Sequence, residues 1–147
     1  MHAGPFRRVL VGWDCSAGAA AALHAAVAIA ADGTARVVAL AVIRPAPHTE
    51  DRDEGAADLA GRRQDAERSF AKARDAFDDA SRARVSLKFA ESTDAARTLC
   101  EYAELHGYDL IVLGRHGLGG VLHPRLGHVA ETAAKKSTIP LLLLTGR

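Results

Sequence analysis

The glycine-rich stretch at residues 108–129, YDLIVLGRHGLGGVLHPRLGHV, constrains the fold more than any other part of the chain. Residues 110–113 form a continuous apolar run, which is typical of a parallel strand covered on both faces. The glycines that follow, before a helix-forming segment at residues 129–136, are Gly114, Gly117, Gly119, Gly120 and Gly127. A strand that turns through glycines into a helix gathers backbone N–H groups at the positive end of the helix dipole. The stretch therefore predicts a phosphate site that needs no charged side chain.

The glycine spacing differs from the two common phosphate-binding motifs. A P-loop needs Lys and then Ser or Thr after its second glycine, whereas Gly120 and Val121 follow Gly119 here. The dinucleotide fingerprint needs a glycine at the position of Leu122 and normally follows the first strand, whereas this loop comes late. The alternative is that these glycines are plain turn formers, although ordinary turns need only one or two of them.

Apolar runs alternate with helical segments along the rest of the chain. The predicted strands occupy residues 8–12, 36–43, 85–90, 110–113 and 141–145. The predicted helices occupy residues 17–31, most of 50–84, a segment from a cap at Ser92 or Thr93 to about residue 106, and 129–136. This order predicts a doubly wound α/β domain over residues 1–147, with a five-stranded parallel sheet and helices on both faces.

The segment at residues 50–84 holds nearly half of the charged side chains of the protein. Within it, apolar side chains recur at helical spacing, at Leu59, Ala66, Phe70, Ala73, Phe77 and Ala80. The pattern predicts one amphipathic helix whose charges form a solvated face, preceded by a loop at residues 48–55.

Composition bounds the classes of function. The chain has 147 residues, of which 48% are hydrophobic and 25% charged, as expected of one globular domain. The net charge of +1 gives no reason to expect nucleic acid or an anionic membrane as a partner. Two cysteines form no disulfide framework, and no long apolar segment opens the sequence, so we expect a cytoplasmic location.

The sheet rule brings the glycine loop and one carboxylate together. In open parallel sheets, ligands bind outside the carboxyl ends of the strands, where the strand order reverses. Asp14 follows the first predicted strand and Gly114 ends the fourth, so both line one crevice if these strands are neighbours. Asp14 could instead be only a turn residue that stabilises Ser16 and the start of the next helix.

The loop and Asp14 together resemble the universal stress protein family. The shared pattern is Gly114-x-x-Gly117, nine residues and then Gly127, with an aspartate after the first strand. The resemblance covers essentially the whole chain and implies strand order 3-2-1-4-5. It also implies a regulatory module of the stress response that binds ATP or AMP, which Mg²⁺ could accompany.

The resemblance assigns a role to each candidate residue. Asp14 would lie by the ribose, and Val42 would meet the adenine through its backbone. Gly114, Gly117 and Gly127 would shape the phosphate loop, and the N–H of His128 would face phosphate. Family members commonly form homodimers by antiparallel pairing of the last strand, and the apolar run at residues 141–144 suits such an edge.

His128 departs from the family, which has Ser or Thr at this position. Histidine keeps the backbone N–H, loses the hydroxyl and adds bulk. We therefore expect either a working site that prefers lower pH or a ring that fills the phosphate site. A metal site at His116, His123 and His128 is not expected, because their spacing puts them on no common helical face.

Two other functions compete with the regulatory module. An enzyme that hydrolyses ATP or transfers a phosphoryl or adenylyl group would need a Lys near the phosphates and a placed base, and neither is evident. The other is a fold relative that no longer binds nucleotide and acts only through protein contacts.

Overall fold

The computed structural model describes residues 6–30, 33–45, 52–115 and 127–145. Its strands are β1 (Arg8–Gly12), β2 (Arg36–Ile43), β3 (Val85–Glu91), β4 (Leu110–Gly114) and β5 (Leu141–Leu144). Its helices are α1 (Ala17–Ile29), α2 (Arg52–Arg74), α3 (Asp79–Arg82), α4 (Ala95–Leu105) and α5 (His128–Lys136). The predicted alternation of strands and helices is confirmed, with one additional short helix, α3.

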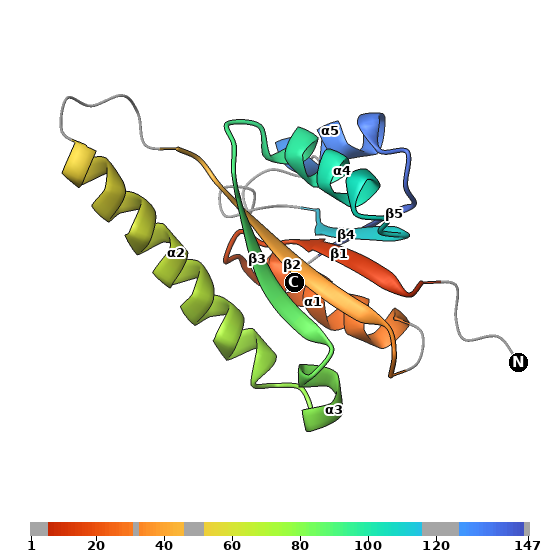
Figure 1. Cartoon of the computed structure of the whole chain (residues 1–147). Helices are drawn as coiled ribbons and strands as arrows, with labels where there is room; N and C mark the ends of the chain where they lie inside the picture. Colours follow the sequence, from red (N-terminus) through yellow and green to blue (C-terminus); the bar gives the residue numbers. More distant parts are fainter. Residues whose placement is uncertain (1–5, 31–32, 46–51, 116–126, 146–147) are drawn as a thin grey trace, which may run out of the picture.

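The strands form one parallel sheet in the order β3-β2-β1-β4-β5. β1 lies in the middle, where Val9 pairs with Val37 of β2 on one side and with Leu110 of β4 on the other. Helices cover both faces (Figure 1). The predicted fold class and strand order are therefore confirmed.

Alternating side chains of the central strands divide the core into two halves. Val9 and Val11 pack on one face under α1 and α2, whereas Leu10 packs on the other face under α4 and α5. All three side chains are fully buried. The alanines of α1 let this helix approach the sheet closely, because small side chains keep the interhelical and helix–sheet distances short. Continuous apolar strands are required here because neither face of the sheet reaches water.

The prediction of one helix through residues 50–84 is wrong. α2 ends at Arg74, and Asp78 then caps α3, where its carboxylate accepts a hydrogen bond from Ser81 N at 2.7 Å. This hydrogen bond lowers the pKa of the Asp78 carboxyl. Phe77 still packs against the core from outside a helix, whereas Ala80 is exposed. The apolar spacing continues across the break because it reflects which side chains face the core, whether or not the backbone is helical. The Asp78 carboxylate instead accepts a backbone hydrogen bond and so starts a new helix.

The start of α2 also differs from the expectation. A loop was predicted at residues 48–55, but the helix begins at Arg52. The earlier part of that loop, residues 48–51, lies outside the described residues.

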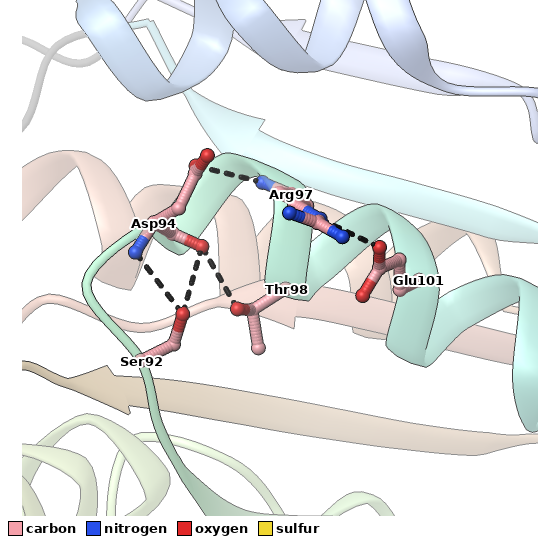
Figure 2. Close-up of polar contacts among 5 residues, drawn as sticks. All are labelled: Ser92, Asp94, Arg97, Thr98 and Glu101. Atoms are coloured by element: carbon pink, nitrogen blue, oxygen red, sulfur yellow. Dashed lines mark hydrogen bonds and ion pairs between the residues drawn. The ribbon is translucent and has the colours of Figure 1, made fainter.

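The predicted cap of α4 is wrong by one or two residues. Asp94 is the N-cap, and its carboxylate accepts from Arg97 N at 3.1 Å (Figure 2). Ser92 supports the cap, since its hydroxyl oxygen accepts from Asp94 N at 3.0 Å. Thr98 donates back to the Asp94 carbonyl at 2.8 Å, and Arg97 pairs with Glu101 one turn along the helix. The Asp94 side chain thus engages one of the first backbone donors of α4.

Candidate functional site

The carboxyl ends of β1 and β4 meet at the point where the strand order reverses. The chain leaves β1 into α1 on one face and enters α5 after β4 on the opposite face. Asp14 follows the end of β1 and Gly114 is the last residue of β4, and these two strands pair directly from Val9↔Leu110 to Val11↔Val112. The condition on which the predicted crevice depended is therefore met.

The turn between β1 and α1 is closed by its own side chains. The Asp14 carboxylate accepts a hydrogen bond from Ser16 N at 3.0 Å and a second one from the Ser16 hydroxyl. The Ser16 oxygen in turn accepts from Ala19 N at 3.0 Å and caps α1. Asp14 thus has the structural role of a turn residue, and it is nevertheless exposed at the carboxyl edge of the sheet.

Cys15 lies between these two residues in an unusual conformation. Its φ of 67° lies in the left-handed region, which costs an L-residue energy and which glycine adopts freely. The thiol is exposed beside Asp14. The turn is therefore held in a strained shape by the contacts around it.

Gly114 joins the two sides of the crevice. A Cβ atom at this position would lie 2.8 Å from the carbonyl carbon of Gly18, in the first turn of α1. The end of β4 and the start of α1 are therefore in direct backbone contact, which only a glycine at position 114 permits. Gly18 was not among the predicted site residues, because one glycine within an alanine-rich helix carries no distinct signal.

The start of α5 is anchored but has no side-chain cap. Arg115 N donates to Leu144 O at 2.6 Å, and Gly127 N donates to Arg115 O at 2.7 Å, which ties the start of α5 to the end of β4. Gly127 is the N-cap of α5 and offers no side-chain acceptor to the first turn. His128 begins the helix with its side chain exposed. Gly117, with Gly119, Gly120, His116 and His123, lies outside the described residues.

Val42 presents backbone groups toward the crevice. The pairing of β1 with β2 ends at Gly12↔Leu40, with one further bond from Trp13 N to Leu40 O at 2.9 Å. In a parallel ladder, alternate residues direct both their N–H and C=O to the same side. Val42 therefore directs its N–H and C=O to the β1 side, beyond the last bond that β1 makes.

Together these groups suit a ligand with a planar polar edge, hydroxyl groups and an anionic end. The Val42 backbone can recognise the edge, the Asp14 carboxylate can accept from hydroxyls, and the uncapped start of α5 can bind the anion. Within the described residues, no three His, Cys, Asp or Glu side chains gather as a metal site would require. Nor does that part of the chain contain a helix with the length and apolar character needed to span a membrane.

Sequence reasoning missed Trp13, which connects the site to α2. Its indole Nε1 donates to the Ser69 hydroxyl oxygen at 3.1 Å, and its ring meets that of Phe70 edge-on at a centroid distance of 5.6 Å. The available signal was that Trp13 is the single tryptophan of the chain and directly precedes Asp14.

The fold and the crevice define a doubly wound α/β domain of the kind that binds ligands where its strand order reverses. Residues 5–145 match the universal stress protein family, and the chain belongs to that family. No curated protein matches the chain significantly.

Solved structures share the fold. Universal stress protein UspA from Lactobacillus plantarum is 23% identical, with a TM-score of 0.82 over 95% of this chain and 98% of that one. A universal stress protein in complex with cAMP is 21% identical, with a TM-score of 0.70 over 97% and 99%. A universal stress protein family protein from Arabidopsis thaliana with AMP bound is 12% identical, with a TM-score of 0.59 over 95% and 92%.

Proposed function

We propose that this chain is a cytoplasmic regulatory module of the stress response that binds ATP or AMP in the crevice between β1 and β4. The proposal takes residues 1–147 as one domain. The single observation that carries it is that two groups lie at the edge where the strand order reverses. One is the exposed carboxylate of Asp14, and the other is the start of α5 at Gly127, which has no side-chain cap. The solved relatives with cAMP and with AMP support an adenine nucleotide as the ligand class.

The proposed placement of the nucleotide follows the groups that line the crevice. Adenine meets the Val42 N–H and C=O, and the ribose hydroxyls donate to Asp14. The phosphates lie at the loop that begins at Gly114, continues through Gly117 and ends at Gly127, and they receive the N–H of His128. A Mg²⁺ ion would bind together with the nucleotide, with the phosphates as its main ligands, because Asp14 is the one carboxylate to which we assign a role at this edge.

The test of this proposal is calorimetric titration of the purified protein with ATP and AMP, together with mass spectrometry of any ligand released from fresh preparations. We expect one nucleotide per chain, and replacement of Gly117 by Val should abolish binding while the fold remains, because a side chain blocks backbone approach to phosphate. An affinity for ATP that is unchanged in this variant would place the nucleotide elsewhere. Steady conversion of ATP to product would favour the competing hypothesis that the protein is an enzyme that hydrolyses ATP or transfers a phosphoryl or adenylyl group.

We also propose a homodimer in which β5 of one chain pairs antiparallel with β5 of another. Leu142 and Leu144 direct their backbone groups to β4, so Leu141 and Leu143 direct theirs to the open side of the strand. The edge carries no charge, whereas the opposite edge strand, β3, carries Lys88 and Glu91. Uncharged apolar edges are normally paired or covered. Sedimentation should give a dimer at micromolar concentration, and a monomer there would refute this arrangement.

A further inference from the structure

Trp13 is the link between the Asp14 turn and α2. Its side chain is only 5% exposed and lies on the face of the sheet that α1 and α2 cover. The indole N–H reaches the Ser69 hydroxyl oxygen at 3.1 Å, across 56 residues of sequence. Phe70 supports the ring edge-on, at an interplanar angle of 87°. The indole is therefore fixed in both position and direction by two adjacent residues of one helix.

The Ser69 hydroxyl is oriented to accept this hydrogen bond. It donates its own proton to the Ala66 carbonyl at 3.1 Å, one turn earlier in α2. That bond fixes the hydroxyl rotor and turns a lone pair toward the indole. Ala66 and Phe70 are themselves buried against the sheet, so this part of α2 is a rigid support.

The turn that follows Trp13 depends on such support. Trp13 N continues the sheet through its bond to Leu40 O, and the chain then passes through Asp14 to Cys15 in the left-handed region. A strained conformation persists only where the surroundings hold it. The other ties of this turn, from Asp14 to Ser16 and from Ser16 to Ala19, are local. Besides the backbone bond to β2, the indole bond is the side-chain hydrogen bond that connects the turn to a separate element, α2.

We infer that Ser69 is a positioning residue for the nucleotide crevice, which it serves by holding Trp13 and thereby the direction of the Asp14 carboxylate toward the ribose. This inference rests on the proposed function. It extends the site from the loops at the carboxyl edge to the middle of α2, which contributes no group that touches the ligand.

Calorimetric titration of three single variants with ATP and AMP tests the inference. Ser69→Ala should weaken both nucleotides by the same factor, about threefold to tenfold, the range expected for the loss of one hydrogen bond. The conservative Ser69→Thr keeps the hydroxyl and should stay within about twofold of wild type. Gln64→Ala, an exposed change on the same helix, is the matched control and should have no effect.

A double-mutant cycle sharpens the test. Trp13→Phe keeps a ring beside Phe70 and removes the indole donor, so it should weaken binding by about the same factor as Ser69→Ala. The double variant should bind no worse than either single one, because both changes remove the same interaction. If Ser69→Ala lowers thermal stability and binds both nucleotides like wild type, Ser69 is only structural and the inference is wrong.

Alkylation of Cys15 without nucleotide separates this inference from the proposed function. The exposed thiol reports the shape of the turn directly, and we expect Ser69→Ala to change its reaction rate by about threefold, the effect of losing one hydrogen bond. Equal rates in wild type and Ser69→Ala overturn the inference whatever the protein binds. A wild type that binds neither ATP nor AMP, with rates that do differ, overturns the proposed function and leaves Ser69 as the support of the turn.

Discussion

The starts of α1 and α4 differ from the start of α5, although all three helices begin at the same edge of the sheet. Ser16 caps α1 and Asp94 caps α4, each through a side-chain oxygen that accepts a backbone N–H. α5 begins at Gly127, which has no side chain to offer. A side-chain oxygen therefore accepts one first-turn donor in each of two helices, whereas within the described residues the N-cap of the third helix supplies no such acceptor.

This difference indicates that the α1 side and the α5 side of the crevice offer different groups to a ligand. On the α1 side, Asp14 and Ser16 already form a closed hydrogen-bonded turn, so only the exposed part of the carboxylate remains for a ligand. On the α5 side, backbone donors and the positive end of the helix dipole suit an anion. The proposed nucleotide would therefore place its sugar at the first side and its phosphates at the second.

The largest expected effect concerns the contact that joins the two sides. Gly114→Ala places a Cβ within 3.0 Å of the backbone of Gly18, which cannot move without shifting α1. We expect the free energy of unfolding to fall by about 2 to 3 kcal/mol, as for other overpacked sites. Gly61→Ala is the control, because among the described residues no atom beyond its chain neighbours and its own stretch of helix backbone lies within 4 Å of the added Cβ. That helical change should raise stability by about 0.5 to 1 kcal/mol in denaturant titrations.

Giving α5 a cap should remove the difference between the helix starts. Gly127 has φ −60° and ψ 156°, which an aspartate adopts without strain. In Gly127→Asp the carboxylate would take the N–H groups of the first turn and repel phosphate, so ATP affinity should fall at least about tenfold. Gly127→Asn supplies a capping side chain without a charge, so calorimetry of this variant separates the effect of capping from that of charge. Gly127→Ala supplies neither a cap nor a charge and is the control. If Gly127→Asp and wild type bind ATP with equal affinity, the phosphates do not bind at the start of α5.

Relaxing the α1 side should affect stability and leave binding alone. Cys15→Gly removes the cost of a left-handed φ of 67°, and we expect the free energy of unfolding to rise by about 1 kcal/mol. Part of this gain is offset because glycine makes the unfolded chain more flexible. Thermal unfolding measures the change, and a loss of stability would mean that the Cys15 side chain contributes a contact that outweighs the strain.

The smallest expected effect is the pH dependence of the α5 side. Imidazole side chains gain a proton in the neutral range, and a charged His128 beside phosphate would strengthen binding. ATP affinity should therefore rise about threefold as pH falls from about 8 to about 6. ATP itself titrates over this range, so the decisive quantity is the difference in slope between wild type and His128→Ser. Good ATP binding by His128→Ser, with none by wild type at any of these pH values, would instead mean that the ring fills the phosphate site.

Sequence patterns predicted the alternation of strands and helices, because buried strands and helix periods are local signals. The order of the strands within the sheet was implied by the family resemblance, and the sheet rule then placed Asp14 and Gly114 at one edge. Sequence patterns failed at α4, where Ser92, Thr93 and Asp94 are adjacent polar residues and the path of the chain decides which one caps. They also missed the break before Asp78, since Phe77 remains at the core across it.

The contact of Trp13 with Ser69 lay beyond sequence reasoning for a different reason. The two residues are 56 positions apart, and neither follows a motif. Only the packing of α2 against β2, β3 and α1 brings them together. The part of the site that depends on strand order was thus predictable, and the part that depends on side-chain packing between distant elements was not.

The most direct measurement of the central claim compares the two cysteines of the chain. Cys15 is exposed beside Asp14, whereas Cys100 lies half-buried on α4, where burial raises the pKa of its thiol. Mass spectrometry can follow alkylation of both residues with and without ATP. At an ATP concentration tenfold above Kd, modification of Cys15 should slow about tenfold, while Cys100 should react at an unchanged rate. Equal rates at Cys15 with and without saturating ATP would contradict a nucleotide in the crevice between β1 and β4.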